Sequence, residues 1–422
     1  MSPRPQSGRR RKVPAFSFVL VSLLLNALPL GGPVGAAALE PASPGPLSVR
    51  IVGNHFVDGR GVPVRLLGVN RSGTEYECMD GKGFSDGPDD AASIGVMASW
   101  HINTVRIPLN EDCWLGLNGA PAAFSGSNYR NAIVAYIGRL HAAGLYVIVD
   151  LHWSAQGTLP ADGRTGQGRK MADRDHAPAF WRSVATTFRT DPAVVFDLFN
   201  EPHDISWDCW QNGCTTTDAT GTWQVAGYQS LVDAVRATGA PNPVLVAGNR
   251  WAGDLRGWPH GVQDPIHQLA ASWHVYSPGP RLDSLRDLVV RPVAATYPVV
   301  AAEFGEKDCA PSWVHDFMGW ADDAGISYLA WTWNTWPDCG NPVLITAYDG
   351  TPTAYGIGVR DHLAALWQAK AATRVLTPLQ AYAPLAAVAG GAILLIVAFL
   401  GASVFTLRRL RRRRRAQGAT AL

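Results

Sequence analysis

The chain of 422 residues is long enough for one large α/β barrel, and its 47% hydrophobic content supports a sizeable core and excludes a disordered chain. The formal net charge of +2 hides an asymmetry, because twelve of the 36 basic residues lie in the two terminal tails and none of the 34 acidic residues does. The middle of the chain therefore carries 24 basic against 34 acidic residues, a net charge of about −10. This balance argues against a nucleic-acid surface and fits a body that binds neutral ligands.

Residues 1–38 are predicted to be a secretory signal peptide. A basic run ends at Lys12, the apolar stretch FSFVLVSLLLNALPL follows, and small residues near Ala36 to Ala38 suit cleavage. A retained membrane anchor is the alternative. The proline-rich residues 39–46 are expected to form a lead-in rather than a domain.

The next segments predict strands. Residues 47–64 suggest a short β-hairpin that turns at DGRG. Eight further segments are nearly continuously apolar, as expected of strands covered on both faces of a parallel sheet. They span residues 64–70, 103–110, 145–153, 194–202, 243–251, 271–278, 297–306 and 327–334.

Segments of helical length separate these strands, such as residues 127–144 and residues 221–239, of which the second is expected to stop at Gly239. Eight such units predict a (β/α)8 TIM barrel preceded by the short hairpin, in a catalytic domain at residues 47–375. A doubly wound open sheet is the rival, but no glycine-rich phosphate loop follows any strand.

The C-terminal region predicts a membrane anchor. Residues 383–407 are uncharged and long enough to span a bilayer core of about 30 Å. The arginine-rich residues 408–422 mark the cytoplasmic side by the positive-inside rule. The body is thus expected to be exported and held at the extracellular face by a single C-terminal span.

Six cysteines agree with an oxidising compartment, although the sequence alone does not fix their connectivity. The pairs closest in sequence are Cys78–Cys113, Cys209–Cys214 and Cys309–Cys339, and each would brace the loops at the barrel mouth. A zinc site is the less favoured reading, because paired C-x-x-C elements are absent.

Two glutamates stand where barrel enzymes carry their catalytic groups, at the carboxyl ends of strands. Glu201 follows the fourth strand, where Pro202 restricts the backbone, and Glu303 follows the seventh. Paired carboxyl groups across a sugar-sized cleft suggest glycoside hydrolysis, in which one protonates the leaving oxygen and the other attacks the anomeric carbon. Arg106 is a candidate to keep one carboxylate charged, and Tyr276 to donate a hydrogen bond to the same group.

Six motifs in combination resemble glycoside hydrolase family 5, the retaining cellulase-type enzymes. They are VRIP, DLHW, NEP, WHVY, AEFG and AWTWN. The resemblance covers about Leu66 to Gln368 and implies hydrolysis of a β-linked glucan in the manner of an endo-β-1,4-glucanase, with no metal and no cofactor. One departure is Ala302, where glycine more usually precedes the nucleophile.

The same resemblance implies roles for individual residues. Glu201 matches the acid/base and Glu303 the nucleophile. The matching substrate-binding positions are Arg106, His152, Asn200, His274, Tyr276 and Trp331. Trp333 lies close enough to Trp331 that either could be the ring that stacks on a sugar. The acidic pair Glu75 and Glu77 is expected on a solvated loop face.

Other functions remain open from the sequence. The same mechanism could act on β-mannan, as an exo-β-glucosidase, or on a glycolipid headgroup, because loop shape decides specificity. A non-catalytic sugar-binding barrel is a second possibility. A third is a metal-dependent hydrolase using His152, His274, Asp150 and Glu201, although the first strand ends in GVN rather than an H-x-H pair. The sequence gives no indication of the oligomeric state.

Overall fold

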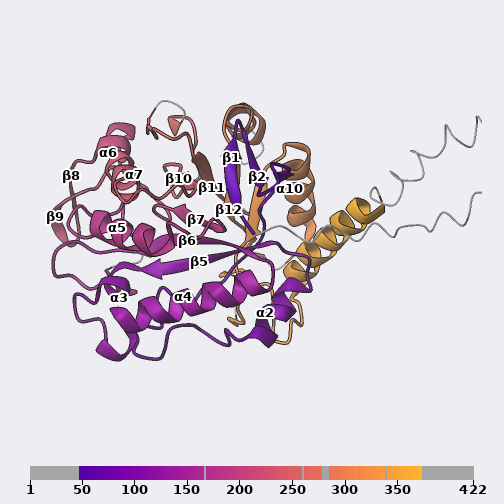
Figure 1. Ribbon diagram of the computed structural model, residues 1–422, viewed down its shortest axis with the longest axis horizontal. Coiled ribbons are helices and arrows are strands. Elements are labelled where there is room, and N and C mark those ends of the chain that lie inside the picture. The colour runs from indigo at the N-terminus through magenta and orange to yellow at the C-terminus, as the bar shows by residue number, and fades with distance from the viewer. Residues whose placement is uncertain are drawn as a thin grey trace, which may run out of the picture. The chain divides into compact units, whose positions relative to one another are not determined.

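The body of the protein is a closed barrel of eight parallel strands (Figure 1). The computed structural model describes residues 47–372, apart from 166–167, 259–260, 278–284, 309 and 338–339. The strands follow one another around the barrel as β4 (Leu67–Asn70), β5 (Thr104–Asn110), β6 (Tyr146–Trp153), β7 (Val194–Asp197), β10 (Val244–Ala247), β11 (Leu269–Ser277), β12 (Val299–Glu306) and β13 (Ser327–Ala330). The predicted TIM barrel and all eight of its predicted strands are confirmed.

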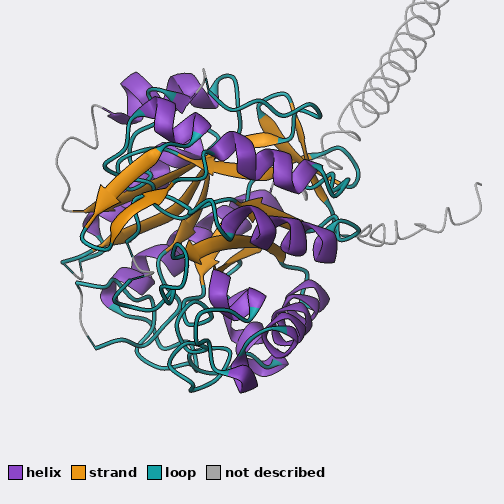
Figure 2. Cartoon of the chain, turned by 90° about the vertical axis from the view of Figure 1, so that its left-hand side faces the viewer, coloured by secondary structure: helices purple, strands orange, loops and turns teal. Residues whose placement is uncertain are grey.

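Helices enclose the strands (Figure 2). They are α2 (Ala91–Ala98), α3 (Glu111–Leu115), η1 (Ala122–Phe124), α4 (Ser127–Ala142), α5 (Ala177–Phe188), α6 (Trp207–Asn212), α7 (Tyr228–Arg236), η3 (Arg286–Val290), α9 (Arg291–Ala294) and α10 (Ser312–Asp323), and residues 354–372 form a further helix. Helix α4 shows why these segments are helical, because its buried residues recur at three- and four-residue spacing: Tyr129, Ile133, Tyr136, Ile137 and Leu140.

The N-terminal segment differs from the predicted hairpin. It forms three antiparallel strands, β1 (Val49–Val52), β2 (His55–Asp58) and β3 (Pro63–Val64). The predicted DGRG turn joins β2 to β3, whereas a second turn at Gly53 and Asn54 joins β1 to β2. Gly53 has a φ of 60°, which glycine adopts without the steric cost that other residues meet. The hairpin prediction therefore missed this first turn.

The predicted helix at residues 221–239 is also only partly correct. Helix α7 occupies Tyr228–Arg236 and the chain turns away at Gly239, whose φ is 77°. The residues before it form β9 (Gly221–Gln224), which pairs with β8 (Thr215–Asp218) in an antiparallel ribbon. Trp223 is buried on one face of this ribbon while its neighbours are exposed, which is the alternation of a strand.

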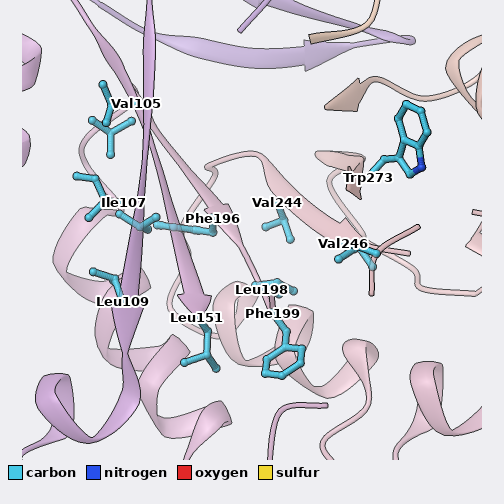
Figure 3. Close-up of a cluster of buried hydrophobic side chains, with 14 of the residues drawn as sticks. Val105, Ile107, Leu109, Leu151, Phe196, Leu198, Phe199, Val244, Val246 and Trp273 are labelled. Carbon is cyan, nitrogen blue, oxygen red and sulfur yellow. The ribbon is translucent and has the colours of Figure 1, made fainter. Parts of the chain in front are cut away.

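Alternate residues of each barrel strand contribute to two different cores. One set packs outward against the helices, as Val105, Ile107 and Leu109 of β5 do (Figure 3). The other set fills the barrel interior: Leu66, Tyr146, Ile148, Val195, Leu245, Ala270, Val300, Ala302 and Leu329. Val49, Ile51 and Phe56 of the N-terminal sheet join this inner core, so that sheet covers the end of the barrel where the strands begin.

The helix at residues 354–372 also reaches the end of the barrel where the strands begin. Its residues Trp367 and Lys370 line a hollow together with Phe56 and Val64 of the N-terminal sheet and with Pro298, which precedes β12. The last described residues of the chain therefore lie near the amino ends of the strands. The N-terminal sheet and this helix share that end of the barrel.

Two of the three predicted disulfides are present. Cys78 in the loop after β4 is bonded to Cys113 of α3, and Cys209 of α6 is bonded to Cys214 just before β8. The predicted Cys309–Cys339 pair lies outside the described residues. Both observed bonds join segments that follow the carboxyl ends of strands.

The predicted termini are likewise outside the described part of the chain. These are the signal peptide at residues 1–38, the lead-in at 39–46, the membrane span at 383–407 and the tail at 408–422. Among the helices that are described, none is long and apolar enough to cross a membrane.

Candidate active site

Charged residues occupy the inward positions of the barrel strands toward their carboxyl ends. On β6 the inward series runs from apolar Ile148 to Asp150 and His152. Strand register pairs Asp150 with Asp197 of β7. In the same way it pairs Asn70 with Arg106 and His274 with Glu303. The closed sheet thus gathers residues from distant parts of the chain into one polar layer above the inner core.

Arg106 is the centre of this layer and is fully buried. Its guanidinium donates to Glu303 Oε1 at 2.7 Å and to Asp197 Oδ2 at 3.0 Å, and it lies 2.6 Å from Asp150 Oδ2. Burial opposes the positive charge, but the three carboxylates outweigh it and raise the pKa of Arg106. Burial also raises the pKa of Asp197. Arg106 is therefore the counter-charge that makes a buried group of three carboxyl side chains tolerable.

Two amide side chains complete the contacts of Arg106. Its Nη1 donates to Asn70 Oδ1 at 3.0 Å and its Nη2 to Asn200 Oδ1 at 2.9 Å. Asn70 in turn donates to the Ala302 carbonyl at 2.8 Å, next to Glu303. Asn70, the last residue of β4, therefore holds the arginine beside Glu303.

Glu303 accepts hydrogen bonds at both oxygens. Arg106 donates to Oε1, and the Tyr276 hydroxyl donates to Oε2 at 2.6 Å. His274 Nδ1 lies 3.4 Å from Oε2. Only 5% of the Glu303 side chain is exposed, so its carboxylate is fixed in direction by these donors.

Glu201 lies opposite in a different environment. Its side chain is 29% exposed at the cleft surface, and the enclosing protein raises its pKa above the ordinary value. Its Oε1 is 3.0 Å from His274 Nδ1. Ligand atoms of Glu201, His274 and Glu303 all lie within 4.8 Å of one another. The two carboxyl groups therefore share one small space at the barrel mouth.

His274 is neutral between these two glutamates. Burial lowers the pKa of its imidazole to about 4. Carboxyl oxygens face Nδ1, whereas Nε2 has no hydrogen-bond partner among the described residues. The geometry thus fits the tautomer that carries its proton on Nδ1, which donates toward Glu201 and Glu303.

His152 differs from His274 in charge. Its Nδ1 lies 3.1 and 3.2 Å from the two oxygens of Asp150. Burial opposes the positive charge, yet Asp150 outweighs it and raises the pKa of His152 to about 9. The ring stacks on Trp331 with centroids 5.4 Å apart. His152 therefore presents a cationic edge at the cleft near neutral pH.

Glu75 is not on a solvated loop face, contrary to the sequence-based expectation. Only 3% of the residue is exposed, and one carboxyl oxygen accepts from the Gly73 amide at 2.6 Å. Burial raises the pKa of Glu75 to about 7, and the nearby charge of His152 opposes that rise. The loop after β4 folds back into the mouth, a path that its polar composition did not reveal.

A cavity of about 250 Å³ opens above the paired glutamates. It is lined by His152, Trp153, Gly168, Arg169, Phe199, Asn200, Glu201, Trp251, Tyr276, Glu303, Lys307, Trp331, Gly340, Asn341 and Pro342. Trp331 lines it, whereas Trp333 is 1% exposed and packs on Trp100 in the outer core. Of the two tryptophans, only Trp331 can meet a sugar in this cavity.

Trp251 is a cleft residue that the sequence interpretation missed. The residue is 51% exposed, and its ring stacks on His203 with centroids 4.6 Å apart. Arg250, Trp251 and Ala252 all have positive φ, of 56°, 54° and 56°. The left-handed conformation is sterically unfavourable for three successive non-glycine residues. The turn is held by the Trp251 amide, which donates to the Pro202 carbonyl at 2.9 Å. The turn directs an aromatic ring to the Glu201 side of the cleft.

The comparison with protein families agrees with this geometry. The model for "Cellulase (glycosyl hydrolase family 5)" matches residues 57–336, which is more than half of the chain. The chain belongs to glycoside hydrolase family 5. Members of this family hydrolyse glycosidic bonds, so the polar layer of the barrel is the catalytic end of a hydrolase.

Curated relatives of this family-5 hydrolase are endoglucanases. Endoglucanase 1 of Robillarda sp. (strain Y-20) is 25% identical over 303 residues, covering 60% of this chain and 74% of that protein. Endoglucanase 1 of Saitozyma flava is 27% identical over 235 residues, covering 53% of this chain and 62% of that protein. The chain thus spans under two thirds of the second relative's length.

Solved structures share the fold. A β-glucanase of Saccharophagus degradans in complex with cellotetraose has a TM-score of 0.57 at 21% identity, covering 76% of this chain and 94% of that chain. The catalytic domain of Thermobifida fusca endoglucanase Cel5A has a TM-score of 0.53 at 18% identity, covering 75% and 97%. Both similarities support the barrel of the family-5 hydrolase.

The family-5 hydrolase brings all eight site residues named from its sequence into one region. His152, Asn200, Tyr276 and Trp331 line the cavity with the two glutamates, while Arg106 and His274 lie beneath it. The sequence interpretation named Asp150 only as a possible metal ligand and did not name Asp197, yet both hold Arg106. Each is a charged residue within an apolar strand, and that signal could have identified both as partners of a buried cation.

Proposed function

We propose that the protein is a retaining endo-β-1,4-glucanase that acts by double displacement. The observation that carries this proposal is the closeness of Glu201 and Glu303, whose ligand atoms lie within 4.8 Å of each other. Retaining glycosidases hold their carboxyl groups about 5 Å apart, whereas inverting enzymes leave a wider gap for water. The two groups also differ in exposure and in hydrogen-bond partners, as an acid and a nucleophile must.

In the first step, Glu303 attacks the anomeric carbon and Glu201 protonates the departing glycosidic oxygen. Arg106 and Tyr276 fix the attacking carboxylate through hydrogen bonds of 2.7 and 2.6 Å. The raised pKa of Glu201 favours the protonated form that a general acid needs. In the second step, Glu201 deprotonates a water molecule, which cleaves the glycosyl–Glu303 ester and restores both groups.

The substrate class rests on the curated relatives and on the aromatic lining of the cleft. Both relatives described above are endoglucanases. Trp331 stacks on His152 in the lining of the cavity, and the half-exposed Trp251 is held next to Glu201 by the hydrogen bond from its amide to the Pro202 carbonyl. Rings in these positions can stack on sugars at either side of the cleaved bond, which suits an internal cut in a β-linked glucan.

Azide rescue of the two glutamate variants tests this assignment. On an aryl β-glycoside with a good leaving group, we expect Glu303→Ala to be inactive and to regain turnover with azide, giving the α-glycosyl azide. Glu201→Ala should give the β-glycosyl azide, because its glycosyl-enzyme still forms. The reverse pattern of products, or a Glu303→Ala enzyme with nearly normal turnover, would overturn the assignment. A parallel panel of β-glucans, β-mannans and glycolipids identifies the natural substrate class.

We also propose that the catalytic domain, residues 47–375, is exported and tethered. Residues 1–38 would direct export, residues 383–407 would span the membrane, and the arginine-rich residues 408–422 would remain in the cytoplasm. When the chain is truncated before residue 383, the activity should leave the intact cells and appear in the medium. Equal release of the full-length and shortened chains would contradict the anchor.

A further inference from the structure

A second group of titratable side chains lies outside the catalytic layer. Glu111 is the first residue of α3, and Asp173 and His176 lie just before α5. Glu111 and Asp173 are 0% and 1% exposed. His176 Nδ1 is 3.7 Å from Glu111 Oε1 and 3.6 Å from Asp173 Oδ1, and ligand atoms of all three lie within 4.8 Å of one another.

The two carboxyl groups of this cluster are incompletely paired. Glu111 Oε1 accepts from the Ala155 amide at 3.3 Å and Asp173 Oδ1 from the His176 amide at 2.8 Å. The other oxygen of each, Glu111 Oε2 and Asp173 Oδ2, is buried and meets no donor among the described residues apart from the opposing carboxyl group, with which it can share a proton. Within 4 Å, their ion pairs in the described chain are with His176 alone. Buried, unpaired carboxylates are costly unless a proton or a cation compensates them.

We propose that Glu111, Asp173 and His176 bind a divalent transition-metal ion such as Mn²⁺ or Zn²⁺. The Ala155 carbonyl, 3.2 Å from His176 Nδ1, supplies a fourth donor. Two carboxylates, one imidazole and a carbonyl form a mixed oxygen and nitrogen set that suits these ions better than Ca²⁺ or Mg²⁺, which prefer oxygen alone. The two carboxylates, once deprotonated, provide the negative charge that the ion neutralises.

Proton movements accompany this binding. In the metal-free arrangement, His176 Nδ1 carries a proton toward the Ala155 carbonyl. Coordination through Nδ1 requires the neutral tautomer with its proton on Nε2, and about a fifth of this side chain is exposed, so Nε2–H can face solvent. Because carboxylate and imidazole ligands must be deprotonated to bind an ion, uptake of the ion competes with protons and strengthens as the pH rises.

The position of the cluster gives the ion a structural role. Ala155 follows β6 and Asp173 precedes α5, so the two ends of the connection between these elements meet at Glu111. Gly168 and Arg169 of the same connection line the catalytic cavity. Closing a long loop costs conformational entropy, and a cation that joins its two ends offsets that cost. The ion would therefore brace one wall of the cleft and take no part in the chemistry.

The full-length protein, stripped with a chelator and desalted, tests the site. We expect MnCl₂ or ZnCl₂ at about a hundredfold excess over Kd to raise the Tm by roughly 5 °C or more, with one ion per chain by elemental analysis. CaCl₂ and MgCl₂ should raise it far less. Glu111→Gln should abolish the rise while leaving the metal-free protein folded, because glutamine matches the size of glutamate but offers no negative charge to an ion. His176→Ala, at a partly exposed position, should weaken binding.

Two variants distinguish this site from others in the molecule. Glu303→Gln should retain the full metal response, because it alters only the catalytic cluster. Glu77→Gln, a carboxylate of the loop after β4, should behave as wild type. A metal response that is absent in wild type, that survives in Glu111→Gln, or that is lost in Glu303→Gln would overturn the proposal. If wild type shows no metal response, Glu111 and Asp173 share a proton instead. Wild type would then lose stability as the pH rises, with or without metal.

Discussion

Replacing Glu75 by glutamine should remove a pH dependence from the stability of the barrel. Glu75 is buried, and its pKa is raised from 4.5 to about 7, chiefly by burial. Because the folded state holds this proton more tightly than the unfolded state, the stabilisation is fully present below pH 4.5 and is lost as the pH rises through about 7. The shift corresponds to about 3 kcal/mol. Glutamine has a similar shape, can accept from Gly73, and carries no titrating proton.

Calorimetric unfolding between pH 5 and pH 8 measures this difference. A change of 1 kcal/mol moves the Tm of a domain of this size by about 2–4 °C, so Glu75→Gln should gain roughly 5–10 °C relative to wild type across the range. Glu77→Gln is the matched control, because Glu77 lies two residues away and is only partly buried. It should gain much less.

A Tm difference between Glu75→Gln and wild type that does not change with pH would contradict this prediction. If the Tm difference between Glu75→Gln and wild type stays within about 2 °C at every pH, Glu75 does not titrate in a buried position. A gain in Tm of Glu75→Gln that grows toward low pH would reverse the sign of the linkage and would equally contradict the argument.

Three further predictions concern the cleft. Tyr276→Phe removes a hydrogen bond to an ionised acceptor, worth about 1.5–3 kcal/mol, and should lower kcat/KM on an aryl β-cellobioside roughly 10- to 150-fold, whereas a change under twofold would deny the contact a role. Trp251→Ala should impair cello-oligosaccharide cleavage about tenfold more than aryl cellobioside cleavage, and equal losses would remove the ring from the leaving-group side. Reduction of Cys78–Cys113 and Cys209–Cys214 should lower activity before it lowers the Tm, and simultaneous loss of both would show that the disulfides hold the barrel itself.

The barrel could be read from the sequence because its strands are buried on both faces. Such strands appear as short, nearly continuous apolar runs, and the residues that interrupt them at one end are the site residues. Glu201 and Glu303 were identified in this way, since each follows an apolar strand within a family motif. The closeness of their carboxyl groups required the closed sheet, which sequence spacing alone does not measure.

Features that depend on the path of loops could not be predicted. Glu75 lies in a polar, glycine-containing loop, and nothing in its composition indicates that the loop folds into the mouth. Residues 221–224 precede a true helix and were assigned to it, because four residues are too few to show a strand period reliably. Trp251 is presented by a left-handed turn at Arg250, Trp251 and Ala252, and none of these three is the glycine or asparagine that usually adopts this conformation.

One end of the barrel is closed and the other opens at the catalytic site. The N-terminal sheet closes one end, and the last described helix, with Trp367 and Lys370, reaches the same end. The paired glutamates open at the other. The described chain therefore both begins and ends at the closed base, so neither of its described ends lies across the mouth, and a long polymer can approach the paired glutamates unobstructed by them.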